Sequence, residues 1–330
     1  MRLATYEAVP GGRATVGAVL GDRVIPLSEL WPAEAGEPPR DMVDTIEAWA
    51  DAGPALLAAA ERRATSAGEA VADLDREARW LPPVPRPSKV LGVAINNGGL
   101  ADKAEVMPAH PMLFCYPPSA LTGHLRPIEI RPDYGLTHPE PELGVIIGQR
   151  GKNVPIDDAL DLVFGYTVID DITSVDLKTG DTTVFPESFA DTLGGESPEP
   201  GVRPRGFEFG KMVLTYHARS KGTDTFAPCG PWITTADEIA DPQKLAVVLD
   251  IDGEPCTEDN TANLVHTVAA TIAHASRFFT LEPGDILHVG TAARDHLRRR
   301  DVGPARLDRH VEPGLLVEAF VLRDVVAGAL

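Results

Sequence analysis

Two glutamates, Glu140 and Glu142, stand one residue apart in the stretch HPEPELGVIIG, directly before an apolar run that predicts a buried strand. Side chains two positions apart on a strand project from the same face, so the two carboxylates are expected about 6 to 7 Å apart along it. Carboxylates held this close raise one another's pKa unless a cation lies between them. The pair therefore indicates either a cation site or two solvated charges at a strand end.

A second acidic pair follows another apolar run. Asp170 and Asp171 end the stretch VFGYTVIDD, where a carboxylate can meet the first pair if the two strands are neighbours. Oxygen ligands without cysteine favour a hard divalent cation such as Mg²⁺, Mn²⁺ or Ca²⁺ over zinc or copper. His138 stands beside the first pair, where it either supports a carboxylate or is an ordinary hydrogen-bonded residue at a strand end.

The composition restricts the partners of such a site. Lysine and arginine total 30 against 49 aspartate and glutamate residues, a formal net charge of −19. This charge repels nucleic acid and anionic membrane surfaces, and no apolar run approaches the ~20 residues of a membrane helix. The start of the sequence lacks the apolar core of a signal peptide, so a cytoplasmic protein is predicted. The three cysteines show no metal-ligand spacing.

The chain divides at a proline-rich segment. Residues 80–90, WLPPVPRPSKV, hold four prolines in eleven positions, too many for a helix or an inner strand, and are predicted to be a linker. Residues 1–79 alternate strand and helix patterns, with a helix break expected at Gly53-Pro54, and predict a small α/β domain. Residues 91–330 form the predicted main domain, in which residues 186–210, rich in Gly, Pro and Glu, are expected to be an inserted loop or lid.

The elements that must position the acids are mostly strands. Short apolar runs bounded by Gly, Pro and Asp predict strands in KVLGVAIN, PMLFCYP, ELGVIIG, FGYTVID, KLAVVLDID, GDILHVG and GLLVEAFVL. Two helical patterns interrupt them, the short IDDALDLVF and the longer TANLVHTVAATIAHASRFF, for which Asp259 or Asn260 is the expected cap. This distribution predicts an α+β protein with a β-rich main part.

Six sequence blocks resemble the fumarylacetoacetate hydrolase family. They are WLPPVPRPSK, LFCYPPSALTG, EPELGVIIG, VFGYTVIDDITSVD, KGTDTFAPCGPWI and LEPGDILHVGTA, and they follow one another in the family's order along nearly the whole chain. The resemblance implies a small N-terminal domain followed by a mixed β-roll catalytic domain. It also implies a homodimer and a site in which Mg²⁺ or Mn²⁺ chelates a 2-oxo acid or β-diketo acid.

The same resemblance implies roles for individual residues. Glu140, Glu142 and Asp171 match the metal ligands of the family. Lys221 matches a lysine near the substrate oxygens, where its charge stabilises a developing oxyanion, and Thr291 matches a threonine that contacts substrate. With a Lewis-acidic cation, these residues imply an enzyme that cleaves a C–C bond through a metal-bound enolate, as a hydrolase or a lyase.

Three departures from the family pattern bear on the substrate and the reaction. The His and Glu that activate water in hydrolytic members correspond here to Leu100 and Lys103. Tyr116 replaces a lysine, and Val175 and Lys178 replace an arginine and a glutamine that grip the substrate. Tyr116 and Lys178 are therefore predicted to contact a bulkier or less charged substrate than the family's usual diacids.

The missing pair leaves the reaction open. Hydrolytic C–C cleavage requires an activated water, whereas decarboxylation, tautomerisation, dehydration and rearrangement do not. A third interpretation is a protein that holds a metal and a keto acid without turnover. A small oxo acid or diketone is the expected ligand in each case.

Overall fold

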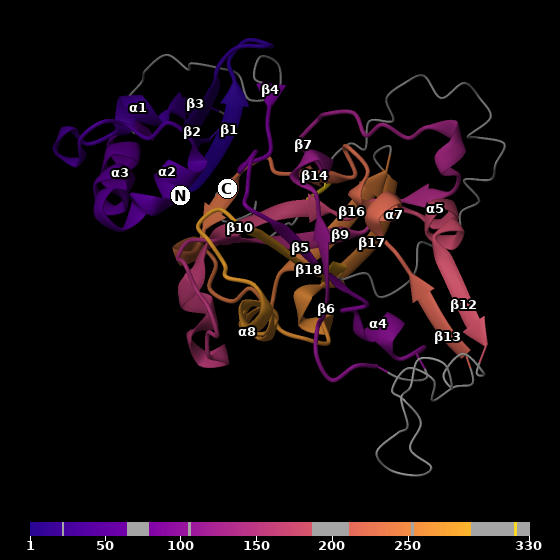
Figure 1. Ribbon diagram of the computed structural model, residues 1–330. Helices are drawn as coiled ribbons and strands as arrows, with labels where there is room; N and C mark the ends of the chain where they lie inside the picture. Colours follow the sequence, from indigo (N-terminus) through magenta and orange to yellow (C-terminus); the bar gives the residue numbers. More distant parts are fainter. Residues whose placement is uncertain are drawn as a thin grey trace.

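The computed structural model describes residues 1–21, 23–64, 79–104, 107–186, 211–251, 254–291 and 320–321 of the chain. The segment predicted to be a lid, residues 186–210, lies outside these residues except for Pro186, and so does most of the last predicted strand. The described part has the predicted α+β class, with a large mixed sheet and few helices (Figure 1). No helix in these ranges combines the length and apolar content that crossing a membrane requires.

The main sheet has 12 strands within the described residues. They are β1 (Arg2–Glu7), β2 (Ala14–Leu20), β3 (Arg23–Pro26), β4 (Arg79–Trp80), β5 (Val90–Ala94), β6 (Met112–Tyr116), β7 (Leu121–Gly123), β9 (Pro141–Ile147), β10 (Val163–Asp170), β14 (Ala227–Cys229), β15 (Ile233–Thr235) and β18 (Ile286–Thr291). The order is β3-β2-β1-β15-β10-β9-β18-β5-β6, with β4, β7 and β14 beside this path. The sheet is mixed because β5 and β18 are parallel, as are β7 and β14, whereas β9 is antiparallel to both of its neighbours.

Smaller sheets and short helices surround the main sheet. The additional strands are β8 (Thr137–His138) with β11 (Thr173–Ser174), β12 (Thr182–Pro186) with β13 (Lys211–Thr215), and β16 (Ala246–Ile251) between β17 (Glu254–Asn260) and β19 (Phe320–Val321). The α-helices are α1 (Leu27–Leu30), α2 (Met42–Glu47), α3 (Trp49–Ala64), α4 (Gly98–Ala101), α5 (Val175–Gly180), α7 (Ala218–Gly222) and α8 (Val268–Phe278). The 3-10 helices are η1 (Ala33–Ala35), η2 (Pro118–Ala120), η3 (Pro132–Tyr134), η4 (Ile156–Leu162), η6 (Ala236–Glu238) and η7 (Thr261–Asn263).

Hydrogen bonds join the N-terminal strands to the rest of the sheet. Strand β1 pairs with β15, Leu3 opposite Ile233, so residues on both sides of the predicted linker share one continuous sheet. Between β4 and β5, residues 81–89 form neither helix nor strand, and Val84 among them is buried. The division into two domains at residues 80–90 stays a prediction.

The strands that carry the acids lie in the centre of this sheet. Every residue of β9 and of β10 is buried, which explains their nearly continuous apolar sequences. Helix α8 packs its buried Val268 and Ile272 into the same apolar cluster as Val145 of β9 and Leu287 of β18. This packing holds the backbone of the central strands firmly.

Three helix predictions need correction. Helix α8 starts later than expected, because the side chain of Thr267 accepts a hydrogen bond from Ala270 N and caps it, whereas Asn260 caps only η7. The IDDALDLVF pattern forms the 3-10 helix η4. The break expected at Gly53-Pro54 is wrong: α3 continues through Pro54, since a proline in the second turn withholds only one hydrogen bond and the helix buries an apolar face.

Candidate metal centre

Three neighbouring strands bring the acidic residues together. Glu142 lies on β9 between β10 and β18, opposite Ile169 on one side and Thr291 on the other. Asp171 directly follows β10, and its backbone N–H donates to the carbonyl of Glu140 at 2.9 Å. The antiparallel register therefore places the end of one predicted strand beside the start of the other.

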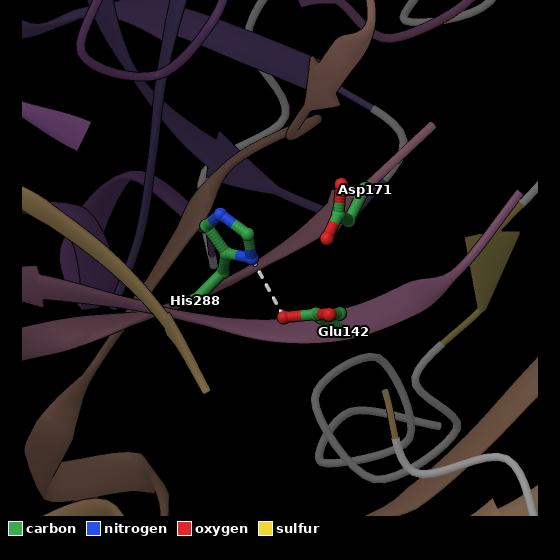
Figure 2. A group of neighbouring side chains, drawn as sticks. All are labelled: Glu142, Asp171 and His288. Atoms are coloured by element: carbon green, nitrogen blue, oxygen red, sulfur yellow. Dashed lines mark hydrogen bonds and ion pairs between the residues drawn. The ribbon is translucent and has the colours of Figure 1, made fainter. Parts of the chain in front are cut away.

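Glu142 is held from one side by strand β18. Its Oε2 accepts hydrogen bonds from His288 Nδ1 at 2.6 Å and from the backbone N–H of Gly290 at 2.7 Å. The side chain is 2% exposed. Burial raises the pKa of Glu142 above its ordinary value, although the neighbouring His288 acts in the opposite direction. Figure 2 shows the Glu142–His288 contact with Asp171 beside it.

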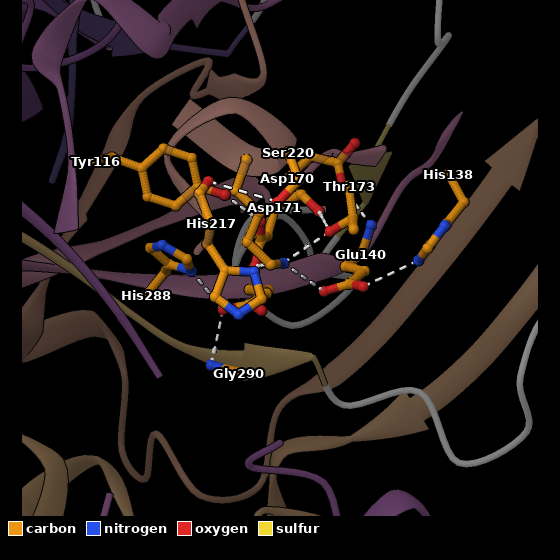
Figure 3. Close-up of polar contacts among 12 residues, drawn as sticks. Tyr116, His138, Glu140, Asp170, Asp171, Thr173, His217, Ser220, His288 and Gly290 are labelled. Atoms are coloured by element: carbon orange, nitrogen blue, oxygen red, sulfur yellow. Dashed lines mark hydrogen bonds and ion pairs between the residues drawn. The ribbon is translucent and has the colours of Figure 1, made fainter. Parts of the chain in front are cut away.

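Lys221 of α7 lies between two of the predicted metal ligands. Its Nζ donates to Asp171 Oδ2, to Thr173 Oγ1 at 2.7 Å and to Glu140 Oε2 at 3.1 Å. Figure 3 labels these three acceptor residues. Burial alone would lower the pKa of Lys221, but the carboxylates of Asp171 and Glu140 outweigh it and raise this pKa. The lysine is therefore a fixed positive charge at this site.

Glu140 has a more open environment than Glu142. Its side chain is 26% exposed, and its Oε1 lies 2.9 Å from His138 Nε2. Burial would raise the pKa of Glu140, but Lys221 and His138 lower it to about 2. His138 therefore hydrogen-bonds to a predicted metal ligand from the end of a strand, a contact that fits both interpretations that the sequence left open.

The fourth acid of the site, Asp170, has a structural environment. It is fully buried, and its Oδ1 accepts from the backbone N–H of Glu140 at 2.7 Å. Burial holds the pKa of Asp170 well above its ordinary value. This side chain fixes the backbone where β9 begins.

The residues predicted to contact substrate lie in three different environments. Tyr116 is 4% exposed, and its hydroxyl donates a hydrogen bond to Asp171 Oδ1, so in this structure it contacts a predicted metal ligand. Lys178 is exposed on α5. The backbone of Thr291 pairs with Glu142, and its side chain lies outside the described atoms. Contact of these three residues with substrate stays a prediction.

The sequence reasoning missed two histidines near the site. His288 is buried in β18, and its ionisable side chain in the otherwise apolar run ILHVG was the available signal. His217 lies one helical turn before Lys221, and its ring centroid is 6.1 Å from that of Phe114. Burial, together with the charges of Lys178 and Lys221, lowers the pKa of His217 and keeps it neutral near pH 7.

The donor atoms at this site fit a divalent cation. Within the described ranges, ligand atoms of Glu142, Asp171 and His288 lie within 4.8 Å of one another. Oxygen ligands on opposite sides of Mg²⁺ are about 4.2 Å apart at bond lengths near 2.1 Å, so a small adjustment completes such a site. The three carboxylates outnumber the Lys221 ammonium, so when they are ionised the site carries an excess of negative charge that favours a divalent ion.

Comparison with known proteins defines the class. The sequence model of the fumarylacetoacetate (FAA) hydrolase C-terminal family matches residues 89–319, and the chain belongs to this family. A protein of Burkholderia cenocepacia that carries only the general name of a hydrolase is 34% identical over 204 residues, which cover 62% of this chain. The match spans about three fifths (61%) of that relative's length.

Two solved structures resemble the chain over most of its length. Maleylpyruvate hydrolase from Sphingobium sp. SYK-6, in complex with manganese(II) and pyruvate, has a TM-score of 0.62 and 27% identity, and the match covers 89% of each chain. A 5-carboxymethyl-2-hydroxymuconate delta-isomerase from Mycobacterium smegmatis has a TM-score of 0.57 and 25% identity, covering 88% of this chain and 87% of that one. The family fold therefore serves both hydrolysis and isomerisation.

Proposed function

We propose that the protein is a divalent-metal-dependent enzyme that cleaves a C–C bond in a 2-oxo or 1,3-dicarbonyl acid through an enolate. The observation that carries this proposal is the buried cluster in which Glu142 and Asp171 face each other beside the Lys221 ammonium. The similarity to a hydrolase whose complex contains manganese(II) and pyruvate, a 2-oxo acid, supports both the metal and the substrate class.

The residues of the site have two roles, binding of the metal and stabilisation of charge on the substrate. Glu140, Glu142 and Asp171 offer hard oxygen donors, for which Mg²⁺ or Mn²⁺ is the proposed ion. When bound, the ion supplies Lewis acidity toward the oxygens of the oxo acid. Lys221 stabilises negative charge that develops on the substrate, and because its pKa is raised it does not act as a base.

An isomerase or another enzyme that needs no activated water is the second candidate. It is favoured by the segment in and just after α4, where the half-buried Leu100 and the exposed Lys103 correspond, by the family resemblance, to the water-activating pair. Neither side chain accepts a proton from water at neutral pH. The similarity to a delta-isomerase supports this candidate, since an isomerase releases no fragment of its substrate.

One experiment distinguishes these functions from non-catalytic binding. The protein is incubated with acylpyruvates, oxaloacetate and related β-keto acids in D₂O with Mg²⁺ or Mn²⁺, and the products are followed by NMR. C–C cleavage releases two fragments, isomerisation incorporates deuterium without fragments, and a binding protein shows only a ligand-raised melting temperature. Glu142→Gln is expected to lose metal uptake and turnover together, and an unchanged rate in that variant contradicts the metal mechanism.

A further inference from the structure

The structure assigns to His288 a role that extends the proposed function and rests on it. We propose that His288 is a positioning residue, which together with the backbone N–H of Gly290 fixes Glu142 so that its second oxygen, Oε1, faces the cation. In this arrangement the imidazole does not bind the metal itself. Glu142 thereby becomes a preorganised ligand on the buried side of the site.

The hydrogen bonds of Glu142 define this orientation. Both donors, His288 Nδ1 at 2.6 Å and Gly290 N at 2.7 Å, contact the same oxygen, Oε2. A carboxylate oxygen offers two lone pairs, so two donors use the capacity of Oε2. Among the described residues no donor contacts Oε1, so this oxygen is the one available to a cation.

An irregularity in β18 makes the double contact geometrically feasible. The register of β18 with β9 shifts between His288 and Thr291, so one extra residue is accommodated there. Gly290 lies in this bulge with φ of +96°, a conformation that glycine adopts freely. Its N–H is thereby turned onto the Glu142 side chain, and a Cβ at this glycine would lie 2.5 Å from Asn96 Cβ.

The imidazole ring of His288 is fixed by its surroundings. The residue is 1% exposed, and its ring lies edge-to-face on Phe114, with centroids 5.5 Å apart, and on Tyr116, with centroids 5.2 Å apart. A Cβ at Gly92 would lie 2.4 Å from Cε1 and 2.5 Å from Nε2 of the ring, so the neighbouring strand leaves room only for glycine. A ring packed on every side holds its Nδ1 at one position.

The positioning role agrees better with the contacts than direct ligation does. Because Nδ1 lies 2.6 Å from Glu142 Oε2, direct coordination through Nδ1 would break this contact. Mg²⁺ and Mn²⁺ also prefer oxygen donors to imidazole. Tyr116 provides a parallel on the other ligand, since its hydroxyl donates to Asp171 while its ring contacts His288. The rings of Tyr116 and His288 thus contact each other, and each side chain hydrogen-bonds to one of the two carboxylates.

Metal affinity tests this role directly. Mn²⁺ binding is measured by EPR on the full chain for wild type, His288→Leu, His288→Asn and Glu142→Gln, with His274→Asn, a half-buried histidine of α8 that stacks on His110, as the matched control. Loss of a group that orients a metal ligand typically weakens affinity about 10- to 100-fold, which is the loss expected for His288→Leu. His288→Asn should recover most of this loss, because the Asn amide can place an N–H close to the position of imidazole Nδ1.

The possible results separate this inference from the proposed function. Wild-type Mn²⁺ affinity in folded His288→Leu overturns the positioning role, as does ¹⁴N modulation from a coordinated imidazole in the pulsed EPR spectrum of the wild-type Mn²⁺ complex. If His288→Leu does not fold, folded His288→Asn is compared with Gly92→Ala, a variant that displaces the same ring. A Mn²⁺ affinity of His288→Asn no higher than that of Gly92→Ala also overturns the positioning role. Wild-type Mn²⁺ binding by Glu142→Gln instead contradicts the proposed function.

Discussion

Glu140 and Glu142 are the same residue type two positions apart, yet they contact different partners and differ in chemistry. Glu142 is 2% exposed and accepts hydrogen bonds from two donors of β18. Its pKa is raised because the effect of burial exceeds that of His288. Glu140 is 26% exposed, contacts Lys221 and His138, and has a pKa of about 2 because these partners outweigh burial. Local environment, and not residue type, decides what each carboxylate can do.

The difference also separates two sides of the site. The deeply buried side consists of β9 and β18, central strands packed between apolar clusters. The other side consists of Glu140, 26% exposed directly before β9, and Lys221 on the five-residue helix α7. We expect metal capture to depend most on the deeply buried side, and charge stabilisation during turnover on the other one.

The largest expected effect concerns metal uptake by the two glutamates. Glu142→Gln should abolish detectable Mn²⁺ binding, because it removes the charge of the buried ligand. Glu140→Gln should weaken binding only about 10- to 100-fold, since its carboxylate is shared with Lys221. Isothermal titration calorimetry of both purified variants measures this, and equal losses would remove the distinction between the two sides.

A large effect is expected on turnover when Lys221 is changed to Met. Removing a preorganised positive charge from a developing oxyanion typically lowers kcat about 10²- to 10³-fold. Mn²⁺ affinity should not fall, since the ammonium that shares Asp171 and Glu140 is gone. Steady-state kinetics and metal titration are compared with Lys244→Met, an exposed lysine paired with Asp241, which should behave as wild type.

A smaller effect is expected for Tyr116→Phe. This variant removes one buried hydrogen bond to the Asp171 carboxylate, an interaction worth about 1.5 to 3 kcal/mol. The free energy of unfolding should fall by roughly this amount in urea denaturation, and Mn²⁺ affinity by about tenfold. If the variant kept full affinity, the hydroxyl would have no part in orienting Asp171.

The smallest expected effect concerns the thermal stability of the metal-free protein, which the two glutamates should influence in opposite directions. The folded-state pKa of Glu140 is lowered from 4.5 to about 2, so its contribution is present above pH 4.5 and is lost as pH falls toward 2. The pKa of Glu142 is raised, so its ionisation destabilises the folded state as pH rises. At pH 7 in EDTA, Glu140→Gln should lower the melting temperature, and Glu142→Gln should leave it unchanged or raise it. Shifts of the same sign would contradict the opposite environments.

Much of the fold was predictable from local patterns. The apolar runs around ELGVIIG, FGYTVID and GDILHVG are strands, and the acids that follow or precede them meet because β9 and β10 are antiparallel neighbours. The helix predictions were less accurate. Thr267 and Asn260 are both good caps, and the choice between them depended on which turn of chain could bury an apolar face against the sheet.

The sequence by itself determined the family and the acidic residues that the structure brings together, and it predicts that Leu100 and Lys103 replace the water-activating pair, because these depend on residue types in order along the chain. Only the tertiary structure decided what each carboxylate contacts. His288 is 146 positions from Glu142, and sheet order and a bulge at Gly290 bring them together. Partners that distant are selected by strand register and packing, which no local spacing encodes.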